Sequence, residues 1–228
     1  MSQVRLTAAR APSAVLFDLD GTLVDSAPDL AGAANEMRLE RGLSRLPYAE
    51  LRAMVGSGAR GMVGIAFGIG PQDEQFTVLR DEFLQRYEAR ITQETRVFPG
   101  IVSVVTRLRE RNVPWGIVTN KAARFSEPLV RALHLDTQVA TLVSGDSTPY
   151  SKPHPEPLLE AARRMGVDPA ACWYVGDDLR DVQAGRAACM TTVAAAWGYL
   201  GIDDPIDTWG AHHVIQSPNE LLNLLGMT

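Results

Sequence analysis

AVLFDLDGTLVDS, residues 14–26, is the stretch of this 228-residue chain that decides its fold. Its first four residues are apolar and the run stops at Asp18, as expected of a strand buried on both faces of a parallel sheet. Asp18 would then lie at the carboxyl edge, where open α/β sheets bind ligands. Asp20 points the same way in an extended chain, and Gly21 allows the backbone to turn away. Both carboxylates can therefore address one site.

These two aspartates also have a purely structural explanation. Asp commonly ends a strand and begins a turn. For an isolated Asp-x-Asp-Gly that explanation is favoured, because short motifs often occur by chance. A catalytic interpretation requires partners elsewhere in the chain.

The composition limits the class of protein. With 46% hydrophobic and 21% charged residues, the chain can bury a sizeable core and form one large domain or two smaller ones. The net charge is −5 and there is no basic block, so no nucleic-acid partner is expected. Cys172 and Cys189 lie in segments predicted to be buried, where we expect core thiols in a reducing cytosol and no disulfide.

No targeting or membrane segment is predicted. The apolar run before Asp18 is too short for a signal-peptide core. No stretch approaches the ~20 apolar residues of a membrane span. We therefore expect a soluble, cytoplasmic protein without a membrane partner.

Residues 27–96 are predicted to be helical throughout. One helix should run from Pro28 to Gly42, and Pro47 should open another. The clearest pattern covers residues 71–91, with charges on one side and an apolar stripe on the other, formed by Phe76, Leu79, Phe83, Leu84, Tyr87 and Ile91. We expect this stripe to be a packing face.

From residue 97 onward, predicted strands and helices alternate. Strands are expected at 115–119, 141–144, 172–175, 191–194 and 213–215, and helices near 101–111, 123–133, 156–165, 179–188 and 218–225. This alternation predicts an α/β fold: a Rossmann-like parallel sheet with helices on both faces. The catalytic core would comprise residues 12–26 and 97–228, and residues 27–96 would form an inserted helical cap over the carboxyl edge.

Polar residues follow the later strands as well. Thr119 and Asn120 could hold an anion at a helix start, although Thr-Asn is also an ordinary helix cap. Lys152 stands in a proline-rich loop. Asp177 and Asp181 are four apart where a helix begins, a place where acids also compensate the helix dipole. The structural explanations do not account for the order of carboxylates, hydroxyl, lysine and carboxylates at four strand ends.

Four segments resemble, in order, the four motifs of the haloacid dehalogenase superfamily: DLDGT at 18–22, VTN at 118–120, KP at 152–153 and GDDLRD at 176–181. That superfamily carries a helical cap between its first two motifs. Within it, residues 18–26, 118–121 and 152–158 resemble the phosphoglycolate phosphatase group. Residues 58–60, 82–87, 115–121, 175–181 and 209–211 resemble the bacterial N-acetylmuramic acid 6-phosphate phosphatases more closely. The two likenesses leave the substrate open.

The resemblance implies a Mg²⁺-dependent phosphatase acting on a small-molecule phosphomonoester. Asp18 would attack phosphorus and form an aspartyl-phosphate. Asp20 would be the general acid and base. The metal ligands would be the carboxylate of Asp18, the backbone carbonyl of Asp20 and the carboxylate of Asp177.

The remaining candidates follow from the same resemblance. Thr119, the backbone N–H of Asn120 and Lys152 would hold the phosphoryl oxygens. Asp181 would orient a metal-bound water or Lys152. In the cap, Ser57 and Arg60 are candidates to reach the distal group of the substrate, the alternative being a solvated loop.

Three other functions compete with this one. A haloacid dehalogenase shares the nucleophile but needs neither metal nor leaving-group acid, so Asp20 and Asp177 argue against it. A phosphosugar mutase shares the chemistry as far as the aspartyl-phosphate. A signalling receiver domain also combines Asp, Thr, Lys and Mg²⁺, but it has no use for the inserted helices.

Overall fold

The computed structural model describes residues 11–201 and 204–227, and its centre is a parallel sheet with the strand order β5-β4-β1-β6-β7-β8. The strands are β1 (Ala14–Phe17), β4 (Trp115–Val118), β5 (Thr141–Val143), β6 (Cys172–Gly176), β7 (Thr191–Ala195) and β8 (His213–Ile215). From β1 the chain first adds β4 and β5 on one side of the sheet and then β6, β7 and β8 on the other. The direction of the connections therefore reverses beside β1. Such a reversal is where open α/β sheets bind ligands.

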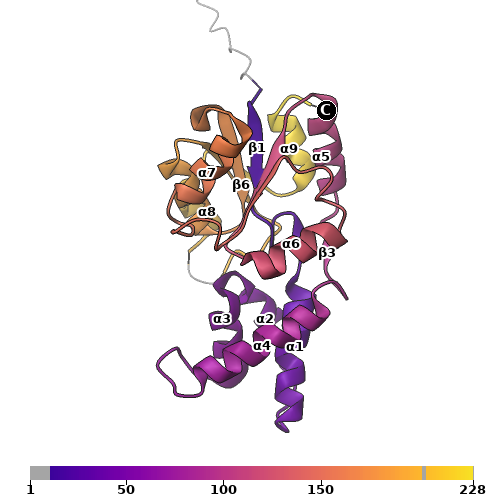
Figure 1. Cartoon of the computed structure of the whole chain (residues 1–228), viewed down its shortest axis with the longest axis vertical. Coiled ribbons are helices and arrows are strands. Elements are labelled where there is room, and N and C mark those ends of the chain that lie inside the picture. The colour runs from indigo at the N-terminus through magenta and orange to yellow at the C-terminus, as the bar shows by residue number, and fades with distance from the viewer. Residues whose placement is uncertain (1–10, 202–203, 228) are drawn as a thin grey trace, which may run out of the picture.

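Helices cover both faces of the sheet, which confirms the predicted fold class (Figure 1). One face carries α5 (Ile101–Glu110), α6 (Ala123–Ala132) and α9 (Pro218–Leu224), and the other carries α7 (Glu156–Met165) and α8 (Leu179–Ala187). Val15 and Phe17 belong to the first apolar cluster, whereas Ala14 and Leu16 belong to the second. This alternation follows from the two-residue period of a strand.

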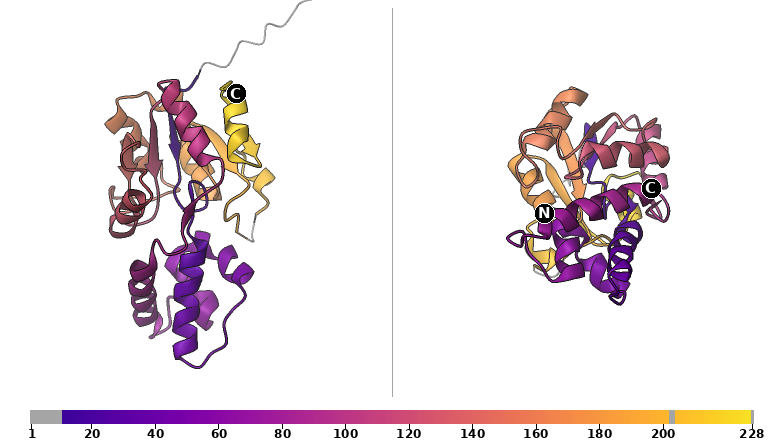
Figure 2. Two further views of the ribbon diagram at one scale, coloured as in Figure 1. Left: turned by 90° about the vertical axis from the view of Figure 1, so that its right-hand side faces the viewer. Right: turned by 60° about the horizontal axis from the view of Figure 1, so that its bottom comes forward.

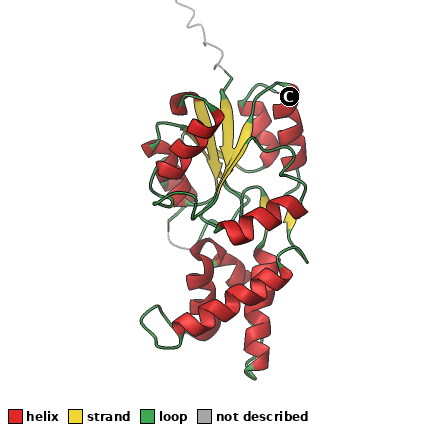
Figure 3. Ribbon diagram, viewed as in Figure 1, coloured by secondary structure: helices red, strands yellow, loops and turns green. Residues whose placement is uncertain are grey.

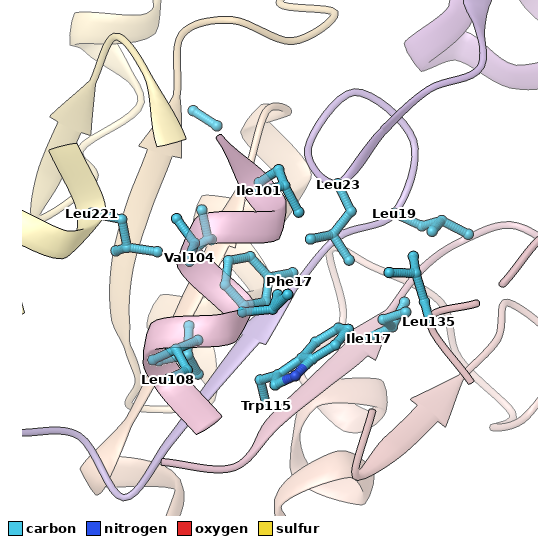
Figure 4. Packing of buried hydrophobic residues seen from close by; sticks show 14 of the residues in the cluster. Phe17, Leu19, Leu23, Ile101, Val104, Leu108, Trp115, Ile117, Leu135 and Leu221 are labelled. Atoms are coloured by element: carbon cyan, nitrogen blue, oxygen red, sulfur yellow. The ribbon is translucent and has the colours of Figure 1, made fainter. Parts of the chain in front are cut away.

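Phe17 lies at the centre of the larger cluster (Figure 4). Its ring meets that of Trp115 on the neighbouring strand edge to face, with the centroids 6.1 Å apart. Val104 and Leu108 of α5 pack against the same region. The last residue before Asp18 is thus fully buried, and it fixes the position at which the first carboxylate leaves the sheet.

The remaining helices form a separate block at one end of the sheet (Figures 1 and 2). They are α1 (Ala27–Glu40), α2 (Tyr48–Ala53), α3 (Gly58–Phe67) and α4 (Phe76–Arg90), and they surround a further apolar cluster that also includes Phe125 of α6 and Tyr199. The expected stripe on α4 is a packing face, since Phe76, Leu79, Phe83 and Tyr87 are buried in that cluster. Within residues 11–201 and 204–227 no helix is both long enough and apolar enough to cross a bilayer.

A buried carboxylate ties the two ends of this block together. Asp29, in the first turn of α1, is fully buried. It accepts hydrogen bonds from the backbone N–H groups of Glu94 and Thr95 and from the Thr95 hydroxyl, at 2.7 to 3.1 Å. Arg90 supplies the opposite charge at 3.5 Å. The segment leaving the block is therefore held against the helix that enters it.

Three details differ from the sequence-based expectations. Val24–Asp25 (β2) pairs with Arg96–Val97 (β3) in a short antiparallel ribbon, although no strand was expected near residue 96 (Figure 3). Helix α4 begins at Phe76 and not near Pro71, because residues 71–75 form turns. Cys189 is exposed, contrary to the prediction. It follows the end of α8 with φ 60°, the left-handed conformation that commonly terminates a helix.

Candidate active site

The polar residues that follow β1, β4 and β6 meet at one pocket of about 420 Å³ between the sheet and the helical block. All the candidates predicted on the α/β part line it: Asp18, Asp20, Thr119, Asn120, Lys152, Asp177 and Asp181. They come from segments far apart in the chain. Their convergence follows from parallel strands ending at a common edge beside the reversal of connections.

Lys152 is a buried cation beside Asp18 and Asp181. Its ammonium donates to the carbonyl of Val118 at 3.1 Å, to the hydroxyl of Tyr174 at 2.8 Å and to Oδ1 of Asp181 at 2.7 Å. These bonds use all three of its N–H groups. Oδ1 of Asp18 lies 2.8 Å from the same nitrogen, but this ion pair lacks hydrogen-bond geometry. Oδ1 of Asp18 thus has no hydrogen-bond donor within the described segments.

The protonation behaviour of the cluster reflects an excess of buried acid. Burial, opposed by the charge of Lys152 and reinforced by that of Asp181, raises the pKa of Asp18 to about 7. Burial also raises the pKa of Asp177 well above its ordinary value, with contributions from Asp18 and Asp181. Although burial alone would lower the pKa of Lys152, Asp18 and Asp181 raise it above its usual range. Lys152 therefore stays charged, and one cation faces three carboxyl groups.

The same carboxyl groups fit a hard divalent cation. Asp18, Asp177 and Asp181 each offer an oxygen, and these oxygens lie within 4.8 Å of one another. Carboxylate oxygen is the ligand that Mg²⁺ prefers in proteins. Asp181 is already engaged by Lys152, by Tyr174 and by the N–H of Asp178. Asp18 and Asp177 are consequently the better placed ligands, and Asp181 is better placed to hold Lys152.

Asp177 is held by Thr22, from the segment that follows β1, and by Tyr199, from the loop after β7. Thr22 donates to its Oδ1 at 2.7 Å, and the N–H of Tyr199 donates to its Oδ2 at 2.6 Å. A Cβ at position 21 would lie 2.0 Å from Oδ2, and Gly21 has φ +84°. Glycine is required there on both counts. Gly198 is needed similarly, because a Cβ there would lie 2.2 Å from the Cβ of Asp177.

Asp20 is held by two different partners. Ser26 donates to its Oδ1 at 2.5 Å, and the ammonium of Lys121 contacts Oδ1 and Oδ2 at 3.0 and 2.9 Å. Lys121 was not among the predicted site residues. Its signal was its place directly after Thr119 and Asn120, at the start of the turn that leads to α6.

Thr119 and Asn120 differ in their local roles. The hydroxyl of Thr119 accepts from the N–H of Lys121 at 3.2 Å, and its side chain is buried. The amide of Asn120 makes a two-way link to the backbone of Lys152: it donates to the carbonyl at 3.0 Å and accepts from the N–H at 2.9 Å. The Asn120 side chain therefore positions the loop that carries Lys152.

The two cap candidates differ in their relation to the pocket. Ser57 lines the pocket and also a second hollow at α3, whereas Arg60 lines only that second hollow. The guanidinium that lines the pocket is that of Arg180. It donates to Asp178 through Nε and Nη2 at 2.7 Å each, and also to the carbonyl of Gly56. Arg180 therefore connects the end of β6 to Gly56, in the turn that precedes α3.

Known proteins share this architecture. The model of the haloacid dehalogenase-like hydrolases matches residues 15–195. An N-acetylmuramic acid 6-phosphate phosphatase from Pseudomonas putida is 41% identical over 212 residues, which cover 93% of this chain and 95% of that protein. A phosphoglycolate phosphatase from Xanthomonas campestris pv. campestris is 45% identical over 213 residues, or 93% and 96%.

A solved structure agrees at the level of the fold. The crystal structure of a predicted phosphoglycolate phosphatase from Haemophilus somnus matches with a TM-score of 0.84 at 24% identity, over 95% of this chain and 99% of that one. The resemblance indicated by the motifs is confirmed by the family match and by the two relatives. The chain belongs to the haloacid dehalogenase-like hydrolase family.

Proposed function

We propose that this chain is a Mg²⁺-dependent phosphatase that hydrolyses a small phosphorylated metabolite through an aspartyl-phosphate on Asp18. One observation carries the proposal: Asp18 lines the pocket, and its Oδ1 lies 2.8 Å from the buried ammonium of Lys152 but makes no hydrogen bond within the described residues. A carboxylate oxygen with free lone pairs beside a fixed cation suits attack on phosphorus. The phosphatase names of the relatives support the same reaction class.

The metal would be held by the carboxylates of Asp18 and Asp177 and by the backbone carbonyl of Asp20. When bound, Mg²⁺ would supply positive charge that offsets the repulsion between the carboxylates and a phosphate dianion. Lys152 would bind a phosphoryl oxygen by exchanging one of its present hydrogen-bond acceptors for it. The hydroxyl of Thr119 and the N–H of Asn120 would bind the others as charge develops.

Asp20 would act as acid and base in the two half-reactions. It would donate a proton to the departing alkoxide and later accept one from the water that attacks the phosphoenzyme. Ser26 and Lys121 bind its two oxygens, which supports a fixed orientation for both transfers. Residues 27–96 would serve as the cap that excludes bulk water, on a core made of residues 12–26 and 97–228.

The pocket favours the larger of the two substrates named for the relatives. Its volume of about 420 Å³ is in the range of pockets that enclose drug-sized ligands. Its helical side is apolar, with Leu30, Phe83 and Leu84. A two-carbon acid would fill a small part of this space. N-acetylmuramic acid 6-phosphate is therefore the more specific candidate that we favour, and a phosphoglycolate-like substrate is the other.

A panel of phosphomonoesters tests these assignments. Phosphate release is measured with Mg²⁺ for both named compounds and for several sugar phosphates, and the substrates are ranked by kcat/KM. We expect the aminosugar phosphate to rank above phosphoglycolate, and activity to disappear in EDTA. Isomerised product without free phosphate would indicate a mutase.

Asp18→Asn is the matched variant for the proposed chemistry. It keeps the shape of the side chain and removes the nucleophile, so turnover should be lost while the circular dichroism spectrum is retained. Wild-type turnover by this variant would rule out the aspartyl-phosphate and with it the proposed function.

A further inference from the structure

A second residue that lines the pocket carries a buried oxygen without a hydrogen bond to the described residues. Within the described part of the chain, Oδ1 of Asp18 and the hydroxyl of Tyr87 are the buried side-chain polar atoms without a hydrogen bond. Both residues line the same pocket. The first oxygen is explained by the proposed chemistry, but the second is not. Leaving a buried hydroxyl unpaired costs free energy, which a bound molecule would recover.

Tyr87 lies on α4, in the helical block, and lines the same pocket as Asp18 and Asp20. It is 2% exposed, and its ring packs against that of Phe125 with the centroids 5.7 Å apart. The ammonium of Lys121 lies 4.7 Å from the centre of the same ring. Lys121 in turn binds both oxygens of Asp20. One lysine therefore separates the phenol from the proposed proton donor to the leaving group.

The phenol is equipped to donate a hydrogen bond. Burial raises the pKa of Tyr87 to about 12, with Lys121 opposing and Asp20 reinforcing the shift. The hydroxyl keeps its proton at neutral pH. Around it the pocket wall is apolar, formed by Leu30, Phe83 and Phe125 among others. The ammonium of Lys121 lies beside the same ring, but it is already bound to both oxygens of Asp20.

We propose that the hydroxyl of Tyr87 binds the leaving alcohol of the substrate, at an oxygen close to the ester. This assignment rests on the proposed phosphatase function. The substrates it selects are phosphomonoesters whose alcohol carries further oxygen atoms near the ester, as a sugar phosphate does. A plain aryl phosphate, which has no such oxygen, gains nothing from Tyr87.

The test compares Tyr87→Phe with the wild type on two substrates, N-acetylmuramic acid 6-phosphate and phenyl phosphate. The change removes one oxygen and keeps the ring that packs on Phe125. We expect the ratio of the two kcat/KM values, sugar phosphate over phenyl phosphate, to fall about 3- to 10-fold, as for one lost hydrogen bond. Tyr48→Phe is the matched control, since Tyr48 lies on α2 and is 45% exposed. Its ratio should stay at the wild-type value.

Thermal unfolding separates ligand binding from a structural role. Within the described residues the hydroxyl makes no hydrogen bond, so Tyr87→Phe should melt at or above the wild-type temperature. A clearly lower Tm, or an unchanged ratio of kcat/KM values, would overturn the assignment. A binding measurement in the Asp18→Asn background gives a second test: adding Tyr87→Phe should weaken binding of the sugar phosphate by a similar factor, and equal affinity would count against Tyr87.

The two proposals fail in different ways. Wild-type protein that releases no phosphate from either substrate would overturn the proposed function and the role of Tyr87 together. Active wild-type protein with an unchanged ratio in Tyr87→Phe would overturn the role of Tyr87 alone.

Discussion

The backbone N–H of Tyr199 donates a hydrogen bond to Oδ2 of Asp177 at 2.6 Å. The phenol oxygen of the same residue accepts from the N–H groups of Ser26 and Ala27 at 2.8 and 3.0 Å, and it donates to Asp25 at 2.7 Å. The first N–H groups of a helix have no partner inside the helix. Tyr199 therefore caps the start of α1 from outside and connects it to a proposed metal ligand.

Tyr199→Phe should disturb the helix start but leave the contact to Asp177, which is made by the backbone. Two buried N–H groups would lose their acceptor, at a cost of about 1–3 kcal/mol. For a chain of this size that corresponds to a fall in Tm of about 2–10 °C. We also expect kcat to fall, because Ser26 orients Asp20, while the Mg²⁺ concentration for half-maximal activity changes little. Thermal melts and a Mg²⁺ titration of activity give both values.

Tyr150→Phe is the control for this variant, because Tyr150 is 58% exposed and lies outside the pocket lining. If Tyr199→Phe matches the wild type in Tm and in kcat, the hydrogen bonds of the Tyr199 hydroxyl contribute neither to stability nor to the orientation of Asp20.

Much of this site can be predicted from sequence, because its residues come directly after predicted strands. Asp18, Thr119 and Asp177 each come directly after a short apolar strand, and the ends of parallel strands share one edge. Once the strands are identified, the meeting of these residues follows. No contact between side chains has to be known.

Other features depend on geometry that a linear pattern does not contain. The pairing of Lys121 with Asp20 requires the direction in which the chain leaves β4. Whether Ser57 or Arg60 faces the pocket depends on the backbone conformation of residues 55–58, which sets the orientation of α3. The β2–β3 ribbon has two residues in each strand, too few to show any periodicity.

Asp20→Ala should slow the reaction according to the leaving group. Removing a general acid costs about 10²–10⁴-fold when an alkoxide departs, and less when the leaving group is a stabilised phenolate. We expect a large loss of kcat with a sugar phosphate. With p-nitrophenyl phosphate the first step should survive, so some phosphoenzyme should accumulate and be detectable by mass spectrometry. Equal losses on both substrates, without phosphoenzyme, would argue against the acid role.

Asp181→Asn tests the support of Lys152. Asp181 accepts from Lys152 and Tyr174 through Oδ1 and from the N–H of Asp178 through Oδ2. The amide keeps the shape but removes the charge beside a buried ammonium. We expect kcat/KM to fall about 10- to 100-fold, as for other groups that orient ligands at metal sites. Glu160→Gln is the control and should retain wild-type kcat/KM, since Glu160 pairs with Arg163 and Arg164 on α7 and lies outside the pocket lining.

The metal-free protein should lose stability as the pH rises through the range where Asp18 titrates. The ordinary pKa of 3.8 applies to the unfolded chain, and the folded value is about 7. Between these values the folded form holds a proton that the unfolded form has released, so the free energy of unfolding decreases with rising pH. The decrease from this group is at most about 4 kcal/mol, and Asp177, whose pKa is raised by the same cause, acts in the same direction.

Mg²⁺ should counteract this loss, because it binds the ionised carboxylates of the folded state. We expect the rise in Tm on adding Mg²⁺ to be larger at pH 7.5 than at pH 5. In Asp18→Asn the titrating group is absent, so the metal-free protein should show a shallower fall of Tm with pH and a smaller response to Mg²⁺. Thermal melts at both pH values, with EDTA or with Mg²⁺, measure the pH dependence of Tm and the rise in Tm that Mg²⁺ causes. Parallel pH profiles for wild type and variant would show that the buried carboxyl of Asp18 does not govern the stability of the site.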